Sequence, residues 1–582
     1  MPRRPDPISS ALPGDKTVTL TFRVGLVLVG LMVALMVGKG IRVASLPVDQ
    51  MVSWNVVIDD GYYYFQVARN LARGHGSTFD RVNRTNGYQP LWTALLVPVY
   101  WFTDDPGRGM RGALVLAVVL AGLALPLMFV GLRRLAGVGG ALLFCGLVVA
   151  NPFFLRIVQG GLETPVLFVT MAGVVALWAL RGEQVLRGQR RACLGFGLLL
   201  ALTTMARVDV ALILAPLALL VVLWGRGWRR RALWIALPGA LVVGPYVLWN
   251  WVTQGSPVPV SGQVKAWVAA TYTPTWDLFR ATEQWRGVTR MVHELTWPWN
   301  GTRREPLLAE LGSRSLPFLL AGALLLLRLL WSARARRNRL ALILLAGSGV
   351  GVVLHGLYMF FVYRSCGHWN YHYFFPLAVV CCVALALSVT LLAADLGLLL
   401  DRLVVRGRLR RGYAALSAAL CLPLLGLLAL HGVPAAAKYE AELRRPPRES
   451  FRHCRLEAAC DMARNYPHDT VFGAWWAGTL GYFSDRRVVN LDGVINSEAF
   501  FRRYLQTDTV DRYIRQGPIT NLVDFFWRDP LHPLSTPASR AFFWEHDKEH
   551  IIARLRPHLR LVHRVPFRGA SGMYIIDVMK PR

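Results

Sequence analysis

The stretch from Asp59 to Trp92 reads DDGYYYFQVARNLARGHGSTFDRVNRTNGYQPLW, and it says more about fold and function than any other part of the chain. Its first part places apolar side chains at helical spacing, at Tyr64, Val67, Ala68 and Leu71. The remainder is rich in glycine, asparagine and other turn-forming residues. The stretch therefore predicts an amphipathic helix that opens with two adjacent carboxylates and is followed by a structured polar loop.

The two carboxylates, Asp59 and Asp60, directly follow the apolar residues Val57 and Ile58. Ionised carboxylates close to a bilayer are costly unless they have a partner or a chemical task. For one of the two, a helix cap that complements the helix dipole is an equally good explanation. The pair is thus a candidate reactive site with a structural alternative.

The composition of the chain is typical of a polytopic membrane protein. Of its 582 residues, 54% are hydrophobic and only 17% are charged, which does not suit a set of soluble domains. The 65 Lys and Arg residues outnumber the 35 Asp and Glu residues, and the net charge is +30.

Most of the basic residues before the C-terminal region form short clusters between apolar runs, as in cytoplasmic loops. A nucleic-acid binder would instead interleave basic and aromatic residues on one surface, so nucleic acid is not an expected partner. The clusters lie at Arg133–Arg134, Arg181–Arg191, Arg226–Arg231, Arg334–Arg339 and Arg402–Arg411.

Apolar runs of nearly spanning length recur along the chain. The first, at 18–37, follows a basic leader at 1–17 that we expect in the cytoplasm, and it is similar to an uncleaved signal anchor. The run at 88–103 contains Pro90 and Pro98 and is the weakest, so it is either re-entrant or interfacial. With the N-terminus and the basic clusters in the cytoplasm and the C-terminal region outside, the number of spans must be odd. We therefore expect roughly 11 or 13 spans. The remaining runs lie at 111–131, 138–153, 162–180, 192–206, 208–225, 232–252, 315–331, 339–363, 373–400 and 413–431.

The expected domains are a transmembrane domain at 18–433, with a first external loop at about 46–88, and an external soluble domain at 434–582. The soluble domain is expected to be α/β, because strand-like pieces occur at Arg487–Leu491 and Met573–Val578.

The acid pair, the Tyr-rich helix with Ala68-Arg69-Asn70 and the turn at Gly74-His75-Gly76 together resemble the first external loop of the GT-C superfamily of membrane glycosyltransferases. That superfamily uses polyprenyl-phosphate sugars and includes protein O-mannosyltransferases, aminoarabinose transferases and the arabinofuranosyltransferases of mycobacterial-type cell walls. The resemblance is strongest to the last group, although Ser77-Thr78-Phe79-Asp80 replaces the Val-Phe-Asn that follows the turn there. It implies a polytopic α-helical fold of GT-C type with a small external α/β C-terminal domain.

The resemblance also implies a reaction, an inverting transfer on the external face of the inner or plasma membrane. The donor would be a polyprenyl-phosphate sugar, and the acceptor a hydroxyl of an envelope glycan, lipid or protein, with a first-loop carboxylate as general base. Counting back from Ala68-Arg69 favours Asp60 as this base, whereas an ungapped alignment of the acid pair favours Asp59. The rings of Tyr63 and Tyr64 are candidates for stacking on a sugar.

Later charged residues on the same predicted face are candidates for binding the donor. Glu163, at the start of an apolar run, either faces the donor or caps a helix. Arg207 and Asp209, between two runs, form either a structural ion pair or an anion site. Lys265 either neutralises the lipid phosphate or snorkels at the membrane interface.

The loop at 363–373 is dense in aromatic and hydrogen-bonding residues. Arg364, His368 and His372 are candidates for donor binding, whereas an aromatic belt at the membrane interface explains the Trp and Tyr residues equally well.

The C-terminal segment at 474–500 predicts a glycine turn, a short strand and a polar loop with Asp492, and it either binds the acceptor or packs over the membrane domain. Two cysteines of this region, Cys454 and Cys460, are candidates for a disulfide if the region faces an oxidising compartment, with two free thiols as the alternative.

Three alternatives stay open. Asp59 and Asp60 are candidates for holding a divalent cation, although two ligands without a third do not define a site. A transporter or flippase of lipid-linked glycans would also have many spans and buried charges, but it would usually have internal repeats, and none is evident here. A non-catalytic scaffold would need neither the acid pair nor Lys265.

Overall fold

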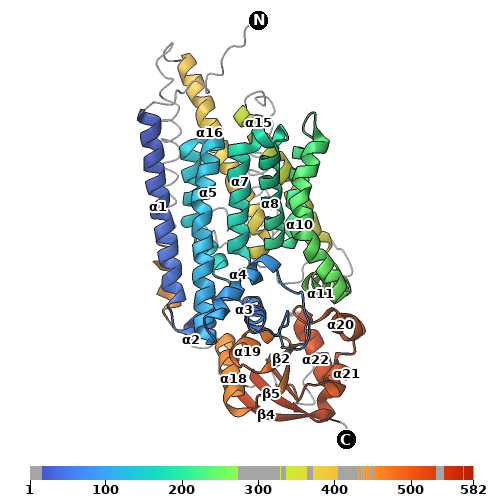
Figure 1. The fold of residues 1–582 in the computed structure, drawn as a ribbon. Helices are drawn as coiled ribbons and strands as arrows, with labels where there is room; N and C mark the ends of the chain where they lie inside the picture. The colour runs from blue at the N-terminus through green and yellow to red at the C-terminus, as the bar shows by residue number, and fades with distance from the viewer. Residues whose placement is uncertain are drawn as a thin grey trace.

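The computed structural model of the chain is a bundle of long helices with a small α/β domain at one end (Figure 1). The structure describes residues 16–272, 336–363, 371–403, 450–527, 529–531, 543–567 and 571–580, with single residues or short pieces at 328, 426, 430, 434, 437–438, 441–445 and 569.

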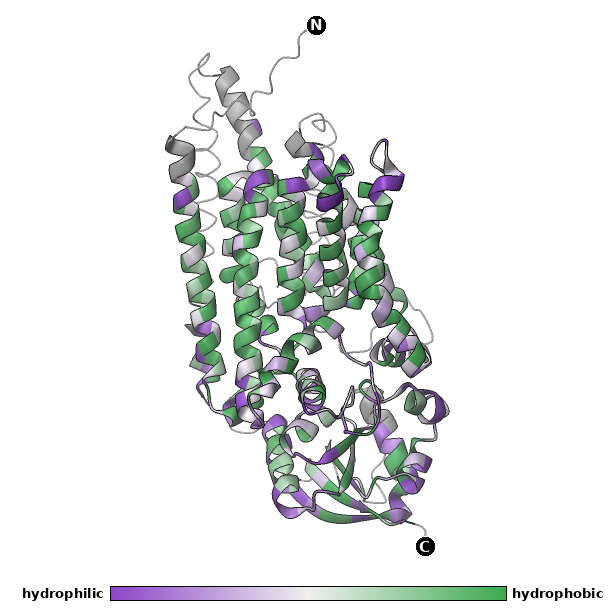
Figure 2. Cartoon of the chain, in the orientation of Figure 1, coloured by the Kyte–Doolittle hydropathy of each residue, from purple (hydrophilic) through white to green (hydrophobic). Residues whose placement is uncertain are grey.

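Within these ranges six helices are long and apolar enough to cross a membrane. Figure 2 shows them as mostly hydrophobic along their length, and large side chains such as Leu31 and Leu241 are exposed on the outside of the bundle. The polytopic α-helical membrane fold expected from the sequence is therefore confirmed. The six are α1 (Lys16–Ala44), α5 (Pro106–Val149), α7 (Thr164–Leu186), α10 (Trp228–Gln254), α15 (Arg336–Phe361) and α16 (Tyr371–Leu403), and the shorter α8 (Arg190–Ala206), η1 (Val208–Val210) and α9 (Ala211–Leu223) pack among them.

The helix α5 is two helices joined by a sharp turn at Gly137, whose φ of 71° favours glycine. Before the turn, the Arg133 guanidinium lies over the ring of Phe22 near the start of α1. After it, the Gln159 side chain donates to the carbonyl of Gly40 near the end of α1. The chain beyond Gly137 thus runs parallel to α1, and the two apolar runs on either side of the turn are separate, as the sequence predicts.

A layer of short helices lies between the bundle and the C-terminal domain (Figure 1). It contains α2 (Val48–Ser53), α3 (Asp59–Ala72), α4 (Pro90–Trp101) and α6 (Pro152–Val158). A helix of 12 residues such as α4 is only about 18 Å long, too short for a hydrocarbon core of about 30 Å. The weakest predicted run is therefore too short to span a bilayer as a helix, and the choice between a re-entrant and an interfacial segment stays a prediction.

Helix α3 differs from its predicted amphipathic form, because every residue from Gly61 to Asn70 is buried. Its second face is covered by α19 (Ala477–Phe483) of the C-terminal domain, against which Tyr62 packs its ring on Tyr482. The polar residues of this face, including Arg69 and Asn70, are therefore enclosed rather than solvated.

The C-terminal domain is built on a five-stranded sheet in the order β2-β1-β3-β5-β4. Strand β1 pairs in parallel with β2 and β3, whereas β5 is antiparallel to β3 and β4. Both expected strands are present, as β2 and β5, which confirms the α/β character. The elements are α18 (Phe451–Asn465), β1 (Val471–Ala474), β2 (Arg487–Asn490), α20 (Glu498–Phe500), η4 (Phe501–Leu505), α21 (Val510–Gln516), β3 (Asn521–Phe526), α22 (Phe543–Leu555), η5 (Arg556–His558), β4 (Leu559–Pro566) and β5 (Gly572–Val578).

The expected disulfide between Cys454 and Cys460 is wrong, because both thiols are free. The two residues lie six positions apart on α18, where successive residues turn by about 100°, so their side chains point to different sides of the helix. Cys454 instead directs its thiol to the carbonyl of Pro566 on β4.

Two predicted spans, at 315–331 and 413–431, lie almost wholly outside the described residues. The span count and the domain boundary near residue 434 therefore stay predictions.

The bundle end farthest from the C-terminal domain is fastened by a buried arginine, Arg231. Its guanidinium donates to carbonyls at the ends of two other helices, among them Leu186 of α7 and Val222 of α9. Three further acceptors, the carbonyls of Arg226, Trp224 and Gly225, complete the set. The carbonyls of Leu186 and Val222 lie in the last turns of their helices, where they lack an intrahelical partner, so Arg231 caps two helix C-termini from outside.

We expect Arg231→Met to lower the free energy of unfolding by about 3 kcal/mol, because several buried carbonyls lose a charged donor. Thermal unfolding of the detergent-solubilised protein, followed by tryptophan fluorescence, measures this. The matched control is Arg230→Met, since Arg230 is exposed. Equal midpoints for the two variants would contradict the capping role.

Candidate functional site

The candidate site lies where the bundle, the short-helix layer and the C-terminal domain meet. It is built from the start of α3, from α11 (Val260–Tyr272), from the first turn of α16 and from the ends of β1 and β2. The backbone of Ile58 is extended, and helix α3 begins at the next residue. Asp59 and Asp60 therefore lie in the first turn of α3.

Asp59 is buried and fully engaged with the C-terminal domain. Its carboxylate accepts hydrogen bonds from the backbone N–H groups of Gly478 and Thr479, both at 3.0 Å, and from the Thr479 hydroxyl at 2.9 Å. The Arg455 guanidinium lies 3.9 Å away. Asp59 therefore caps a helix, but the helix is α19, more than 400 positions along the chain, rather than its own.

The approach between Asp59 and α19 requires a glycine. A Cβ on Gly478 would collide with the backbone carbonyl of Asp59. The first turn of α19 therefore lies directly on the first turn of α3, with no side chain between the two backbones.

Asp60 has a different environment, because its side chain remains 39% exposed. The ammonium group of Lys265, on α11, lies 3.7 Å from its carboxylate. Lys265 also donates a hydrogen bond of 2.7 Å to the hydroxyl of Tyr373 on α16. The site thus presents an accessible carboxylate beside an accessible ammonium, held together by three elements distant in sequence.

The two candidate tyrosines of α3 are both buried. The Tyr63 hydroxyl accepts a hydrogen bond of 3.4 Å from the Asn490 amide at the end of β2. Burial, and after it the negative charge of Asp492, raise the pKa of Tyr63 well above its ordinary value. The Tyr64 hydroxyl donates to Glu163 at 3.0 Å. Neither ring is exposed in the way that stacking on a sugar requires.

Glu163, Arg207 and Asp209 form one buried network behind Lys265 and Tyr373. The Arg207 guanidinium donates to Glu163 at 2.8 Å, to Asp209 at 2.7 and 3.1 Å, and to the carbonyl of His372 at 3.0 Å. Asp209 is also 3.2 Å from the imidazole of His355 on α15. The structural ion pair is therefore the alternative that the geometry fits, and Glu163 pairs with Arg207 rather than capping α7 through its side chain.

The remaining candidates are placed as follows. His372 is buried, and its described polar contact is the carbonyl that accepts from Arg207. Arg364 and His368 lie outside the described residues. Among the described residues no group of three His, Cys, Asp or Glu side chains is arranged to hold a metal ion.

Sequence patterns miss several residues of this junction. Arg455 could not be predicted as a site residue, because nothing in the sequence distinguishes it from the many other arginines of the soluble domain. Tyr373 belongs to the aromatic loop at 363–373, but nothing distinguishes it from its neighbours. Asn490 lies near the end of the strand predicted at 487–491, and a polar residue at a strand end is the one signal that points to it.

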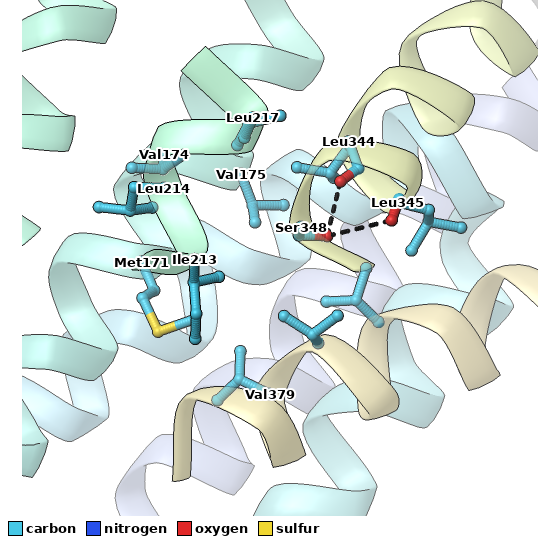
Figure 3. Close-up of a pocket in the computed structure, with 12 residues that line it drawn as sticks. Met171, Val174, Val175, Ile213, Leu214, Leu217, Leu344, Leu345, Ser348 and Val379 are labelled. Atoms are coloured by element: carbon cyan, nitrogen blue, oxygen red, sulfur yellow. Dashed lines mark hydrogen bonds between the residues drawn. The ribbon is translucent and has the colours of Figure 1, made fainter. Parts of the chain in front are cut away.

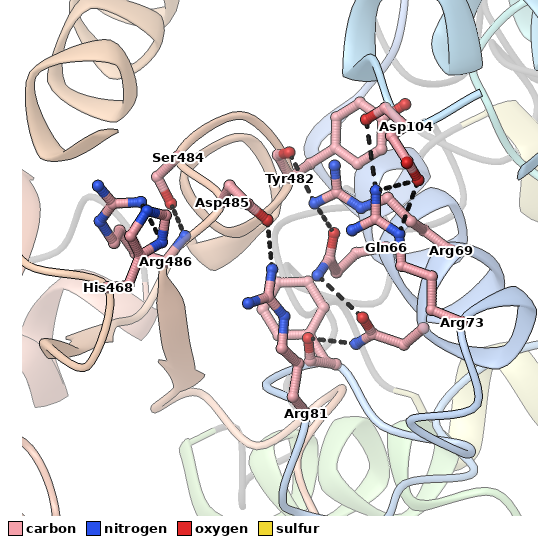
Figure 4. Close-up of polar contacts among 12 residues, drawn as sticks. Gln66, Arg69, Arg73, Arg81, Asp104, His468, Tyr482, Ser484, Asp485 and Arg486 are labelled. Atoms are coloured by element: carbon pink, nitrogen blue, oxygen red, sulfur yellow. Dashed lines mark hydrogen bonds and ion pairs between the residues drawn. The ribbon is translucent and has the colours of Figure 1, made fainter. Parts of the chain in front are cut away.

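A second set of contacts holds the first loop against the C-terminal domain (Figure 4). The buried Arg69 donates to the carbonyl of Tyr482 at 3.0 Å and to Gln66, and its guanidinium lies over the Tyr482 ring. On the surface beside it, Arg81 pairs with Asp485. The acid pair is therefore held in place from both ends of α3.

A small apolar cavity lies among α7, α9, α15 and α16 (Figure 3). Its volume is about 40 Å³, far below the roughly 300 Å³ or more of ligand pockets. The hydroxyl of Ser348, its one polar lining group, donates to the Leu344 carbonyl of its own helix. The cavity is thus a packing defect rather than a substrate site.

We expect Asp59→Ala to destabilise the protein by about 1 to 2 kcal/mol, because α19 loses its cap and the buried Arg455 loses a carboxylate. Asp60→Ala should change stability by less than about 1 kcal/mol, since its ion pair is partly exposed. Thermal unfolding and limited proteolysis of the two variants measure the difference. The assignment fails if Asp60→Ala is the more destabilising.

Comparison with known proteins gives one partial family match and several relatives. Residues 442–556 match a family model described as a domain of unknown function, DUF8728. Over 224 residues the chain is 27% identical to the terminal beta-(1->2)-arabinofuranosyltransferase of Mycobacterium tuberculosis. The match covers 36% of this chain and spans about a third of the relative, 35% of its length.

Several solved structures align with almost the whole chain at low sequence identity. The apo oligosaccharyltransferase of Archaeoglobus fulgidus has a TM-score of 0.49 at 13% identity, covering 94% of this chain and 80% of that one. ArnT from Cupriavidus metallidurans has a TM-score of 0.46 at 14% identity, covering 96% and 97%. The mycobacterial arabinofuranosyltransferase AftD has a TM-score of 0.41 at 14% identity, covering 99% and 40%.

The relative that the chain matches in sequence is named as an arabinofuranosyltransferase. The resemblance to arabinofuranosyltransferases that the sequence suggested is therefore confirmed by a relative matched in sequence.

Proposed function

We propose that this protein is an inverting glycosyltransferase that moves a sugar from a polyprenyl phosphate to an acceptor hydroxyl on the external face of the membrane. The observation that most supports this is that the two carboxylates of the acid pair have different environments. Asp59 is buried as a cap of α19, whereas Asp60 is accessible and lies 3.7 Å from the ammonium of Lys265.

In this proposal Asp60 is the general base. It accepts the proton of the acceptor hydroxyl while the hydroxyl oxygen forms a bond to the anomeric carbon. The bond between that carbon and the phosphate oxygen breaks, and its electron pair leaves with the phosphate. A single displacement of this kind inverts the anomeric centre through an oxocarbenium-like transition state.

Lys265 is proposed to stabilise the leaving phosphate. A compact ammonium is a suitable point-charge partner for phosphate, and Lys265 is already positioned by Tyr373. Its position beside Asp60 would bring the charge developing on the phosphate close to a cation as the proton reaches the carboxylate.

Arg207 is proposed to position the site rather than to bind the donor. Its donors are directed to Glu163, Asp209 and the His372 carbonyl, and binding a phosphate would break buried ion pairs. The network joins η1 and α7 to the first turn of α16, where Tyr373 lies over the Arg207 guanidinium. It thereby fixes the residue that holds Lys265.

The distribution of basic residues supports an external site. The arginine clusters between α7 and α8 and between α9 and α10 lie at the bundle end away from the C-terminal domain, where Figure 2 shows hydrophilic residues at the ends of several helices. Clusters of this kind are typically cytoplasmic. The candidate site and the C-terminal domain are at the opposite end.

The sugar that is moved and the class of its acceptor are to be identified by an assay with several donors and acceptors. The M. tuberculosis relative is named for arabinofuranosyl transfer, so an arabinofuranosyl phosphate of a polyprenol is the first donor to test, with the corresponding mannosyl lipid second. Octyl glycosides and a Ser/Thr-containing peptide supply the acceptor hydroxyls.

We expect Asp60→Asn to lower transfer by about 10²- to 10⁴-fold, the usual contribution of a general base, while the dissociation constant of the donor stays within about threefold of wild type. Release of polyprenyl phosphate by the purified protein measures turnover. Wild-type rates in Asp60→Asn would remove Asp60 as the base. No binding or turnover of any donor by folded wild-type protein would reject the function and favour lipid-linked glycan transport.

We expect Lys265→Met to weaken donor binding and to lower kcat by about 10²-fold, because the leaving phosphate loses its cation. Lys265→Arg, which keeps the charge, should recover part of the rate. Steady-state kinetics with the donor as the varied substrate measure both constants. A loss confined to the acceptor KM would contradict the assignment.

A further inference from the structure

We infer that Asp492 of the C-terminal domain is an acceptor-binding residue of this site, where its carboxyl group holds the hydroxyl next to the one that reacts at Asp60. The inference rests on the proposed function. It makes the acceptor a carbohydrate with two neighbouring hydroxyls rather than an isolated side-chain hydroxyl of a protein.

The topology of the sheet brings Asp492 to the acid pair. Strands β1 and β2 are parallel, so their carboxyl ends lie at one edge of the sheet, the usual position of binding residues in such sheets. The end of β1 leads through Trp475 into α19, whose first turn contacts Asp59. The end of β2 leads to Asp492, so the same edge faces Asp59 and Asp60.

The loop that contains Asp492 lies directly on α11. A Cβ on Gly493 would be 3.4 Å from the Val264 side chain, and Val264 is the neighbour of Lys265. Five residues farther on, Glu498 accepts a hydrogen bond of 2.8 Å from Gln263 of the same helix. The ring of Trp267 meets that of Phe501 at 6.0 Å between centroids. The loop is thus fixed to the helix that supplies the proposed phosphate partner.

The backbone around Asp492 is held in a defined shape. Gly493 has a φ of 85°, a conformation that favours glycine, and the Val494 N–H donates to the Asp492 carboxylate at 2.9 Å. Asn490 bridges the loop to α3 through Tyr63, and Asn496 donates to the Asn490 carbonyl at 2.6 Å. The carboxyl group is therefore oriented before any ligand arrives.

The charges of the acid pair act on Asp492. Burial, followed by the charge of Asp60, raises the pKa of Asp492 well above its ordinary value, with a smaller contribution from Asp59. The charges of Asp492, Asp59 and Asp60 also raise the pKa of Tyr63, whose hydroxyl accepts from Asn490 at the end of β2. A protonated carboxyl can both donate to and accept from a sugar hydroxyl, whereas an ionised one only accepts.

A binding measurement tests the inference without turnover. Octyl arabinofuranoside and octyl mannoside are titrated calorimetrically into the full-length Asp60→Asn protein loaded with donor. We expect the dissociation constant of one glycoside to rise at least tenfold when Asp492→Ala is added, and to return within about threefold of the parent with Asp492→Asn, which still donates and accepts. The matched control is Asp469→Asn, an exposed carboxylate of the same domain.

Kinetics with the otherwise wild-type protein separate acceptor from donor effects. Asp492→Ala should raise the acceptor KM at least tenfold and leave the donor KM within about twofold. With the monodeoxy acceptor that lacks the neighbouring hydroxyl, wild type and Asp492→Ala should become equal.

The contrary results are distinct from a failure of the proposed function. An unchanged acceptor constant in folded Asp492→Ala, or a change in the donor KM alone, overturns the role of Asp492. Transfer to the peptide but to no glycoside overturns the carbohydrate class. Absence of donor binding and turnover in the wild type rejects the transferase itself, and glycoside binding that still depends on Asp492 would then uphold the site without the reaction.

Discussion

The structure depends on one buried contact, the carboxylate of Asp59 on the first turn of α19. Three hydrogen bonds and a nearby guanidinium compensate the charge, which would be costly to bury alone. Because the two backbones meet at Gly478, the contact fixes the distance between α3 and the C-terminal domain as well as their direction. The neighbouring residue, Asp60, is thereby held at the junction with its side chain accessible.

The same contact explains why adjacent, chemically identical residues have different surroundings. Successive residues of a helix point about 100° apart, so when Asp59 faces α19, Asp60 must face another neighbour. That neighbour is α11, with Lys265. Behind it, Arg207 is paired with Glu163 and Asp209 so completely that the surrounding elements have little freedom to shift. An accessible ion pair on a rigid support suits chemistry that requires fixed distances.

Much of this arrangement follows from the sequence. The apolar runs predict α1, α7, α10, α15 and α16, the glycine-rich turn ends α3, and β2 and β5 form where the strand-like pieces lie. Local patterns determine these elements, and local patterns can be read from one chain. The same holds for the acid pair, Glu163, the Arg207 and Asp209 pair and Lys265 as notable residues.

What the sequence does not give is the partner of each residue. A capping aspartate predicts a helix beside it, and nothing local indicates that the helix follows hundreds of residues later. The burial of both faces of α3, the role of Tyr373 and the approach of Asp492 have the same origin, since they depend on how distant elements pack. Cys454 and Cys460 show the opposite case, in which residues close in sequence do not contact each other. Their spacing suggests a disulfide, but the geometry of helix α18 keeps the two thiols apart.

The separation of Asp59 from Gly478, 419 positions, also orders the assembly of the molecule. Chains are made from the N-terminus, so the first loop emerges long before the strands that will cover it. Until then α3 has a polar face without a cover and a carboxylate without its helix. The loop can reach its final form only after the sheet has folded on the same side of the membrane. The site is therefore complete only after the C-terminal domain has been made and has folded. A chain truncated before that domain would lack the site even if every residue of the first loop were present.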